Sequence, residues 1–515
     1  MFTSNSWKQL PKWQYCVAYD SKQNFKIFTN KAQIPDHIIG KVHTWSRYNT
    51  VVEALRRTNH IVDEVPKYVK MAERFVRKGL VKQLDSKILE SIPYWNKLYQ
   101  HQKDAVAYSI IDYKGKVYLA DEMGVGKTLT AVCLTHYLLL KHGNPRILIL
   151  CPASLQKNWK QNFEDKNIDN VDIYSYDKAK NDFKEIKQKK YGIIIADEAH
   201  CVKDTKTKRY KRLAPIMKKI PFKILISGTP TVNRCDELYA PLSILHPKIF
   251  NRKKKFIDRY YNKLSRKCRI PNEIALILPL FGFIRRTKTE VLTLPPKKIN
   301  VINVKDKKAS VKFKIMLTKM QDPENMENPN MLKYLIGEAF HDLGSVKSES
   351  SNFIEAVTVM LDDCAEKTTS KVVFCIHRSV VACLRTLCEN LGKSFEVING
   401  ETAVKKRAGI VSEFQKGNID ILICSINAAG VGLTMTKSNH VIMAESSWVP
   451  GLNQQAIDRC HRIGQTKTVF VDRIFMHNSI DDFIIKCESG KKKMHKLLLK
   501  HLKDNKKKNT IHNYF

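Results

Sequence analysis

The fold of this 515-residue chain is decided by the stretch Asp121-Glu122-Met123-Gly124-Val125-Gly126-Lys127-Thr128. An apolar segment, 117–120, precedes it, and an apolar helical pattern follows over 129–140. A strand, a glycine turn and a helix in this order form a phosphate-binding loop. The glycines let backbone N–H groups close on phosphate oxygens, and the helix N-terminus adds positive partial charge. The stretch therefore predicts a nucleotide site in which all eight residues bind ATP.

A second motif, Asp197-Glu198-Ala199-His200, follows the apolar strand 193–196. Lys127 is expected to reach the β- and γ-phosphates, while Thr128 and Asp197 are expected to hold Mg²⁺. Glu198 stands where it can polarise the attacking water. Both motifs come in order along the chain, and each stands at the end of a strand. The sequence therefore predicts ATP and Mg²⁺ as cofactors, with Lys127 and Glu198 as catalytic residues.

The charge balance favours a polyanionic partner. The chain carries 89 basic and 50 acidic residues, a formal net charge of +39, which a solvated surface does not require. No apolar run approaches the roughly 18 residues of a membrane-spanning helix, and the first 13 residues lack a secretory core. Nucleic acid is therefore favoured over a membrane as the partner.

The 13 cysteines do not have the spacing of a metal or disulfide framework. No Cys-x-x-Cys occurs, and Cys151, Cys375 and Cys424 lie in apolar strand patterns, where cysteine serves as a small core residue. We expect no zinc site and a reducing compartment.

Short apolar strands alternate with helical stretches and form two series. The first contains 117–120, 146–151, 193–196 and 223–226; the second contains 371–375, 395–398, 419–424, 440–444 and 469–474. Strands separated by helices imply parallel sheets. The sequence therefore predicts an α/β fold with two parallel-sheet domains.

Six segments are expected along the chain. They are an N-terminal accessory region (1–90) with a hairpin over 13–29 and a basic helix over 51–80, a first sheet domain (91–245), helical insertions and an interdomain linker (246–365), a second sheet domain (366–478), brace helices (479–503) and a basic tail (504–515).

The motifs, taken in order, resemble those of the Swi/Snf family of DNA translocases, which belongs to the superfamily-two nucleic-acid motors. In that family Asp usually stands at the start of the phosphate loop, where kinases and GTPases have Gly. The further matching stretches are Gln102 in 99–102, 151–155 with Trp159, 227–230, 428–434 and 455–465. They span roughly residues 95 to 485. One departure is Ile457, where the family usually has Glu.

The resemblance implies two RecA-like domains and assigns roles to single residues. Gln102 would read adenine, and Gly432 would contact the nucleotide from the second domain. Arg459 and Arg462 would complete catalysis from that domain, making hydrolysis conditional on its approach; the alternative is a helix with surface ion pairs. Ser154 and Thr434 would bind DNA phosphates without reading bases.

A narrower resemblance concerns the linker. The stretches 284–292 and 294–297 are similar to the interdomain linker of one branch of the Swi/Snf family. This branch contains the HARP-like annealing helicases, which remodel replication forks. This implies a DNA-stimulated ATPase that translocates on duplex or branched DNA and remodels or re-anneals stalled replication forks. The alternatives are a nucleosome-remodelling ATPase of the same family, a non-catalytic DNA-binding scaffold and a strand-separating helicase.

Two basic segments offer further contacts. Lys253, Lys254 and Lys255 lie in the helical insertion, near Arg252 and Arg259, and a DNA phosphate contact is favoured there over a merely solvated face. At the end of the chain, Ile511, Tyr514 and Phe515 have the spacing of a PIP box, which binds the sliding clamp PCNA. Lys508 stands where Gln is usual, and chance aromatics on a disordered end are the alternative. We expect a monomer located in the nucleus or at a site of viral DNA replication.

Overall fold

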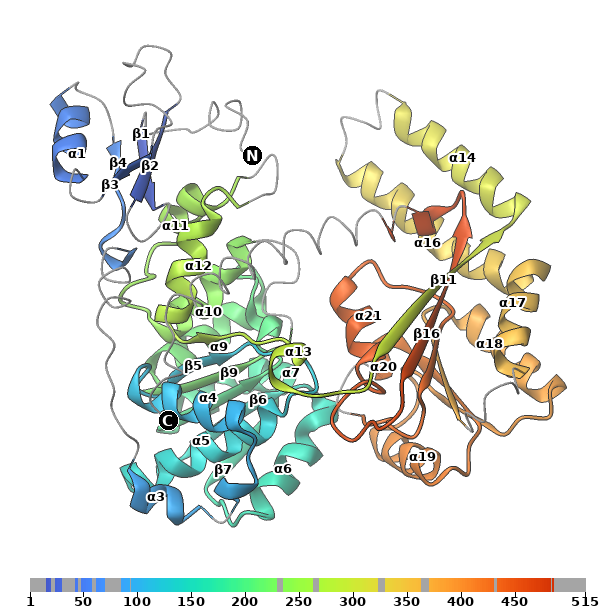
Figure 1. The fold of residues 1–515 in the computed structure, drawn as a ribbon, viewed down its shortest axis with the longest axis horizontal. Helices are drawn as coiled ribbons and strands as arrows, with labels where there is room; N and C mark the ends of the chain where they lie inside the picture. The colour runs from blue at the N-terminus through green and yellow to red at the C-terminus, as the bar shows by residue number, and fades with distance from the viewer. Residues whose placement is uncertain are drawn as a thin grey trace. The chain divides into compact units, whose positions relative to one another are not determined.

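The computed structural model describes residues 15–19, 24–29, 42–44, 48–57, 62–69, 85–92, 94–228, 235–262, 268–322, 329–362, 370–429, 433–482 and 484–485. They belong to two compact units (Figure 1). The first contains the described residues up to Asp121 together with Lys127–Arg285. The second contains Glu122–Gly126 together with the described residues from Arg286 onward.

The first unit begins with a small sheet. The predicted hairpin is confirmed, because β1 (Tyr15–Tyr19) pairs antiparallel with β2 (Asn24–Thr29). Two short strands, β3 (Val42–Thr44) and β4 (Val62–Asp63), complete the order β3-β2-β1-β4. The helix expected over 51–80 is wrong in extent, because α1 (Tyr48–Arg57) ends before β4 begins.

The first large sheet has six parallel strands in the order β10-β5-β9-β8-β6-β7. They are β5 (Lys116–Leu119), β6 (Ile147–Cys151), β7 (Val171–Ser175), β8 (Ile193–Asp197), β9 (Phe222–Ile226) and β10 (Phe283–Ile284). The first strand series is thus confirmed. The series did not include β7 and β10, since β7 is partly polar and β10 has only two residues.

Successive side chains of these strands enter two different cores. In β6, Ile147 and Ile149 belong to one buried cluster, while Leu148 and Leu150 belong to the other. A strand buried on both faces requires helices on both sides of the sheet. One face is covered by α4 (Gln100–Ile111), α5 (Lys127–His142) and α6 (Gln156–Glu164), and the other by α7 (Tyr176–Asn181), α8 (Phe183–Gln188), α9 (Lys208–Lys219) and α10 (Tyr239–Leu245).

A buried ion pair organises the helical insertion of this unit. Arg259 of α11 (Lys253–Tyr260) donates from Nε and Nη2 to both carboxylate oxygens of Glu273 in α12 (Pro271–Leu280), at 2.7 and 2.8 Å. The Tyr260 hydroxyl also donates to Glu273, at 2.6 Å. Arg259 Nη1 donates to the carbonyl of Glu64, and the hydroxyls of Tyr68 and Tyr260 lie 3.0 Å apart. These bonds attach residues of the accessory region to the insertion.

The second unit contains another six-stranded parallel sheet, in the order β11-β16-β15-β12-β14-β13. Its strands are β11 (Lys297–Lys305), β12 (Lys371–Cys375), β13 (Phe395–Ile398), β14 (Ile421–Ser425), β15 (His440–Met443) and β16 (Val469–His477). The predicted α/β fold with two parallel sheets is confirmed. The edge strand β11 lies within 246–365, where the pattern favoured helices and a linker.

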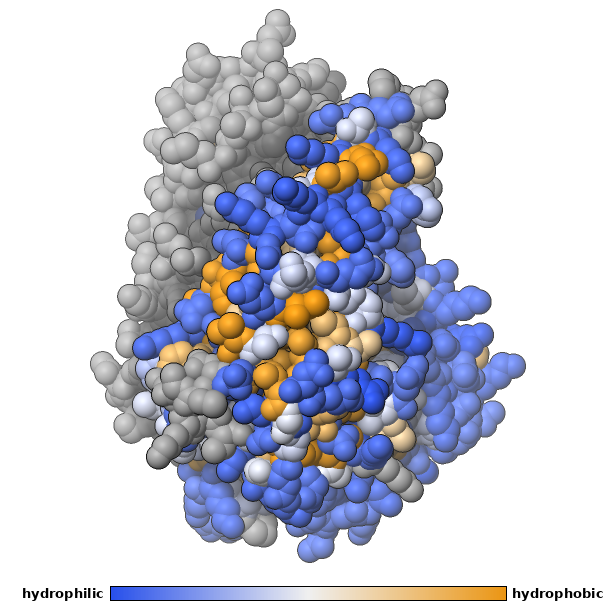
Figure 2. All heavy atoms as spheres, turned by 90° about the vertical axis from the view of Figure 1, so that its right-hand side faces the viewer, coloured by the Kyte–Doolittle hydropathy of each residue, from blue (hydrophilic) through white to orange (hydrophobic). Residues whose placement is uncertain are grey.

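Most of the described helices of the second unit pack on its sheet or on one another. The described helices are α13 (Lys288–Val291), α14 (Lys307–Gln321), α16 (Pro329–Glu349), α17 (Ser351–Asp362), α18 (Arg378–Asn390), α19 (Val404–Lys416), α20 (Ile426–Ala429) and α21 (Pro450–Ile457). Figure 2 views the side that carries α14, α16, α17 and α18, where hydrophobic residues lie among hydrophilic ones. Val311, Ile315 and Tyr334 are among the exposed apolar side chains.

No helix in the described part of the chain is both long enough and apolar enough to cross a bilayer.

We predict that Glu273→Gln lowers the free energy of unfolding of the insertion by about 3–5 kcal/mol, because it leaves the buried Arg259 without its counter-charge. The double variant Arg259→Met/Glu273→Leu should cost less, since both charges are then absent. Hydrogen exchange of the α11 and α12 amides measures both effects.

The control for this prediction is Glu164→Gln, which removes an exposed partner of Lys160 and should change stability by about 0.5 kcal/mol or less. Equal exchange in Glu273→Gln and the control would contradict the role given to the buried pair.

Candidate active site

The phosphate loop has the predicted strand–turn–helix geometry. β5 ends at Leu119 and α5 begins at Lys127. Gly124 and Gly126 adopt φ values of +79° and +85°, a left-handed backbone that side chains with a Cβ rarely adopt. The loop therefore needs glycine at both positions. The 16-residue helix α5 directs its first N–H groups toward the turn.

Lys127 is held against the base of this loop. Its ammonium donates to the Asp121 carbonyl oxygen at 2.9 Å. Burial lowers the pKa of Lys127 to about 8, although the negative charges of Glu198 and Asp121 oppose that shift. The lysine thus contacts the loop and lies close enough to Glu198 for their charges to interact, and its binding of phosphate stays a prediction.

Asp197 ends β8 and is fixed by three groups. Its Oδ2 accepts a hydrogen bond from the indole Nε1 of Trp159 at 2.9 Å, and its Oδ1 accepts one from the Glu198 amide at 2.9 Å. The Tyr176 hydroxyl donates to its carbonyl oxygen at 2.8 Å. The first two bonds orient the carboxylate, and the third holds the backbone of the same residue.

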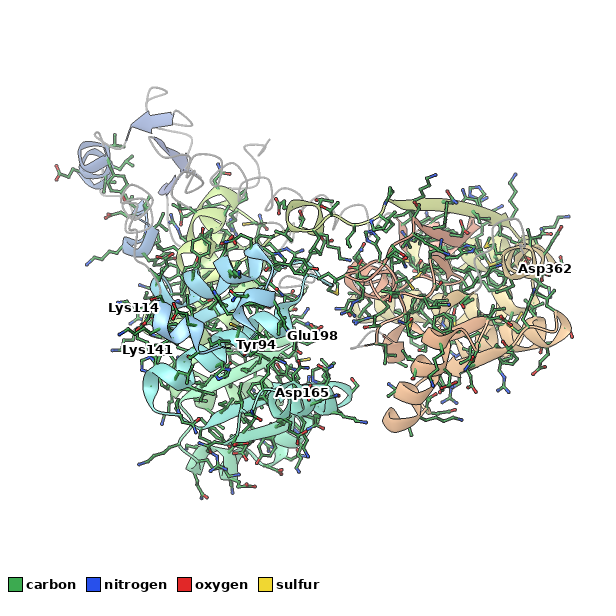
Figure 3. The ribbon with its side chains drawn as sticks, turned by 60° about the horizontal axis from the view of Figure 1, so that its bottom comes forward. Tyr94, Lys114, Lys141, Asp165, Glu198 and Asp362 are labelled. Carbon is green, nitrogen blue, oxygen red and sulfur yellow. The ribbon has the colours of Figure 1, made fainter. Side chains whose placement is uncertain are left out.

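Glu198 stands at the carboxyl end of the sheet, where Figure 3 labels it. Its φ is +50°, a left-handed value that is uncommon for a residue with a Cβ and is found at functional sites. Its Oε2 accepts from Ser227 Oγ at 3.3 Å and lies 3.0 Å from His200 Nδ1. His200 Nδ1 and Ser227 Oγ are 3.2 Å apart. These three side chains form one hydrogen-bonded cluster.

Sequence reasoning named Trp159, His200 and Ser227 only as parts of matching motifs and did not assign them these partners. The structure shows that they orient the two carboxylates. Arg285 was likewise quoted only as part of the linker. Its Nη1 donates to the carbonyl oxygens of Ala120 and Gly228, the latter at 3.0 Å. The linker arginine thus ties the end of β5 to the residue after Ser227.

Gln102 is buried at the start of α4. Its Oε1 accepts from the Tyr99 backbone N–H at 2.9 Å and so caps the helix. Recognition of adenine by Gln102 stays a prediction, as does nucleotide contact by Gly432, which lies outside the described residues.

The predicted arginines follow α21 in the second unit. Nη1 of Arg459 and Nη1 of Arg462 each lie 3.5 Å from the Leu433 carbonyl oxygen. Burial lowers the pKa of Arg462. Within the same unit, a Cβ built on Gly124 would stand 3.0 Å from Arg462 Cβ. The structure therefore brings the phosphate-loop glycine against the arginine segment.

The residues predicted to bind DNA differ in accessibility. Ser154 and Thr434 are half-buried, while Lys254 and Lys255 are exposed. Lys253 is half-buried and donates to Thr205 Oγ1. Binding of DNA by all five residues stays a prediction.

Arg259, which the sequence grouped with this basic cluster, corrects the expectation. It is 4% exposed and paired with Glu273, so it has a structural role. Ile511, Tyr514 and Phe515, which are predicted to bind the sliding clamp, lie outside the described residues.

Two protein-family models match the chain. The SNF2-related domain matches residues 101–169 and 164–333, and the helicase conserved C-terminal domain matches residues 352–464. Together they include the phosphate loop, the acidic motif and Arg459 and Arg462.

Named relatives match over most of this chain. A Caenorhabditis elegans "SWI/SNF-related matrix-associated actin-dependent regulator of chromatin subfamily A-like protein 1 homolog" is 30% identical, over 75% of this chain and 59% of the relative. The human "DNA annealing helicase and endonuclease ZRANB3" is 29% identical, over 75% of this chain and 39% of the relative. The chain thus spans less than two thirds of either relative.

Among solved structures, a Sulfolobus solfataricus SWI2/SNF2 ATPase core in complex with dsDNA is 21% identical and covers 74% of this chain and 88% of that chain, with a TM-score of 0.38. That score is too low to support an argument. The family models follow one another in the order of the two sheets, and the named relatives agree with them. The chain therefore belongs to the SNF2-related family of helicase-like ATPases.

Proposed function

We propose that this chain hydrolyses ATP under stimulation by DNA, translocates on duplex or branched DNA, and remodels or re-anneals forked DNA. The observation that carries the ATPase part is the oriented pair of carboxylates, Asp197 and Glu198, beside Lys127 at one edge of the first sheet. The proposed action on forked DNA is supported by the similarity to relatives named as annealing helicases.

The residues of the first unit fit a Mg²⁺ nucleotide. Thr128 would supply a hydroxyl and Asp197 a carboxylate, and both are oxygen ligands of the kind that Mg²⁺ prefers. Bound Mg²⁺ would neutralise charge on the β- and γ-phosphates. Lys127 would bind the same oxygens once its ammonium leaves the Asp121 carbonyl.

Glu198 is the group suited to orient the attacking water. Its contact with Ser227 and His200 leaves the carboxylate fixed at the strand end, which lowers the entropic cost of aligning water and phosphorus. We propose that Arg459 and Arg462 stabilise the charge that spreads over the transferring phosphoryl group. Such arginines contribute roughly 10³ to 10⁵ in rate.

DNA contact is proposed for Ser154, Thr434, Lys253, Lys254 and Lys255. A net charge of +39 favours binding to the phosphate backbone, which carries no sequence information. Binding to the sliding clamp through the C-terminal residues, a monomeric state and a nuclear or viral-replication location stay predictions.

A nucleosome-remodelling ATPase is the second candidate. It is favoured by the similarity to relatives that are named as regulators of chromatin. Stimulation by nucleosomes without stimulation by forked DNA would support it over fork remodelling.

We expect steady-state ATP hydrolysis to rise on addition of duplex or forked DNA, more than with single strands. Lys127→Ala should lower the stimulated rate by about 10²–10³-fold, because a positioned charge is lost. Glu198→Gln should lower it by about 10²–10⁴-fold while ATP still binds.

The control for hydrolysis is Lys141→Ala, which changes an exposed lysine at the other end of α5. No hydrolysis with any DNA would contradict the proposed motor and favour a scaffold.

Asp197 gives a pH-dependent prediction. Burial, with a further contribution from the charge of Glu198, raises the pKa of Asp197 from 3.8 to about 6. The folded protein therefore binds this proton more tightly than the unfolded chain does. The stability that protonated Asp197 contributes is lost as the pH rises from about 4 through about 6. Without metal, the free energy of unfolding of Asp197→Asn should therefore rise relative to that of wild type by up to about 3 kcal/mol between pH 4 and pH 7.

Thermal unfolding of both proteins across this pH range, without nucleotide, measures the difference. A stability difference that stays constant with pH would contradict the raised pKa.

The exposed lysines of α11 give a test of DNA binding. Lys254→Ala/Lys255→Ala should weaken duplex binding at low salt and reduce the slope of log affinity against log salt by about 0.9 for each DNA phosphate that the variant no longer neutralises. The control is Lys211→Ala/Lys219→Ala, which removes two exposed lysines from α9. The same slope in both variants would show that the exposed lysines of α11 do not contact DNA.

A further inference from the structure

The first residue of α13 is a buried lysine with two strong partners. Lys288 is 5% exposed, and its Nζ lies 2.7 Å from Asp458 Oδ1 and 2.6 Å from the His461 carbonyl oxygen. Burial lowers the pKa of Lys288, while the Asp458 carboxylate opposes that shift. An ammonium buried in this way costs free energy unless such partners compensate it.

Each of these two partners is the neighbour in sequence of one of the two arginines. Asp458 immediately precedes Arg459, and His461 immediately precedes Arg462. Asp458 is itself 3% exposed, and its Oδ1 also accepts from Gln454 Nε2 at 2.7 Å. A single ammonium therefore contacts the residue before each of the two arginines.

The same linker residue also contacts the phosphate loop. The Lys288 backbone N–H donates to Glu122 Oε2 at 2.8 Å, and the Glu122 N–H donates to the Arg286 carbonyl oxygen at 2.9 Å. A Cβ built on Gly124 would lie 3.3 Å from Lys288 Cε. Lys288 thus touches the loop and the arginine turn at once.

A second point of the linker supports the same turn. The ring Nε2 of His461 lies 2.9 Å from the Pro295 carbonyl oxygen. The turn from Asp458 to Arg462 is therefore attached to the linker at Lys288 and again at Pro295, both through His461.

We infer that Lys288 is a positioning residue for ATP hydrolysis: its ammonium, bonded to Asp458 and His461, fixes the directions of Arg459 and Arg462 and their distance from the phosphate loop. This inference rests on the proposed ATPase function. Lys288 acts through the arginine turn, so its loss affects the chemical step more than the binding of ATP.

The variants are chosen to separate positioning from folding. Lys288→Met keeps the apolar stem and removes the ammonium, whereas Lys288→Arg keeps a donor. Asp458→Asn removes the counter-charge. The matched control is Lys305→Met, which changes an exposed lysine at the end of β11.

For Lys288→Met we expect kcat of DNA-stimulated hydrolysis to fall by about 10–100-fold, because small misplacements of catalytic groups have effects of that size. KM for ATP should change by less than about threefold, since ground-state binding is largely retained. Lys288→Arg should recover part of the rate. The double variant Lys288→Met/Asp458→Asn should be no slower than Lys288→Met, since the two residues act as one unit.

A second readout does not depend on activity. Hydrogen exchange of the peptide 454–465 should be faster in Lys288→Met than in wild type or Lys305→Met, with little change in the peptides of β12 and β14. Lack of hydrolysis by wild type would overturn the proposed function, while the exchange result would still decide whether Lys288 holds the turn.

Three results would overturn the inference. The first is hydrogen exchange of 454–465 in Lys288→Met equal to that in Lys305→Met. The second is a rate of ATP hydrolysis equal to that of Lys305→Met. The third is a loss of rate that adds to that of Asp458→Asn and comes with faster hydrogen exchange throughout the second sheet.

Discussion

The site depends on one constraint: parallel strands end at the same edge of their sheet. β9 lies between β5 and β8, so the residues that follow these three strands become neighbours. Ala120, Ser227 and Glu198 are far apart in sequence, yet the sheet brings them together. The bonds from Ser227 to Glu198, and from Arg285 to the carbonyls of Ala120 and Gly228, depend on that strand order.

Polar partners buried under the site provide the next level of order. Trp159 and the Glu198 N–H hold the Asp197 carboxylate, and Tyr176 holds the backbone carbonyl oxygen of the same residue. Glu198 keeps a left-handed backbone in the middle of this network. Such a conformation persists only where the surrounding contacts compensate its cost, of order 1–3 kcal/mol. Contacts in the packed core thus compensate the backbone strain at Glu198 and keep both carboxylates in fixed orientations.

Local patterns predicted the parts of the structure that local forces determine. Apolar strands that are buried on both faces and glycines in a phosphate loop are visible without a partner, and both were predicted correctly. The strand β11 was not, because its exposed residues carry little apolar signal and it forms by pairing with β16 over nine residues. Arg259 and Lys288 are basic residues like any others in the sequence. Their burial depends on the carboxylates of Glu273 and Asp458, and no local pattern pairs either basic residue with its partner.

The attachment of the accessory region to the insertion has a consequence for how this architecture can change over evolution. Glu64 and Tyr68 share a hydrogen-bonded network with Arg259 and Tyr260. A lineage that exchanged its accessory region for another module would therefore lose the bonds to Arg259 and Tyr260 unless the insertion helices changed as well. The two segments should be inherited together, although the phosphate loop lies between them in the gene.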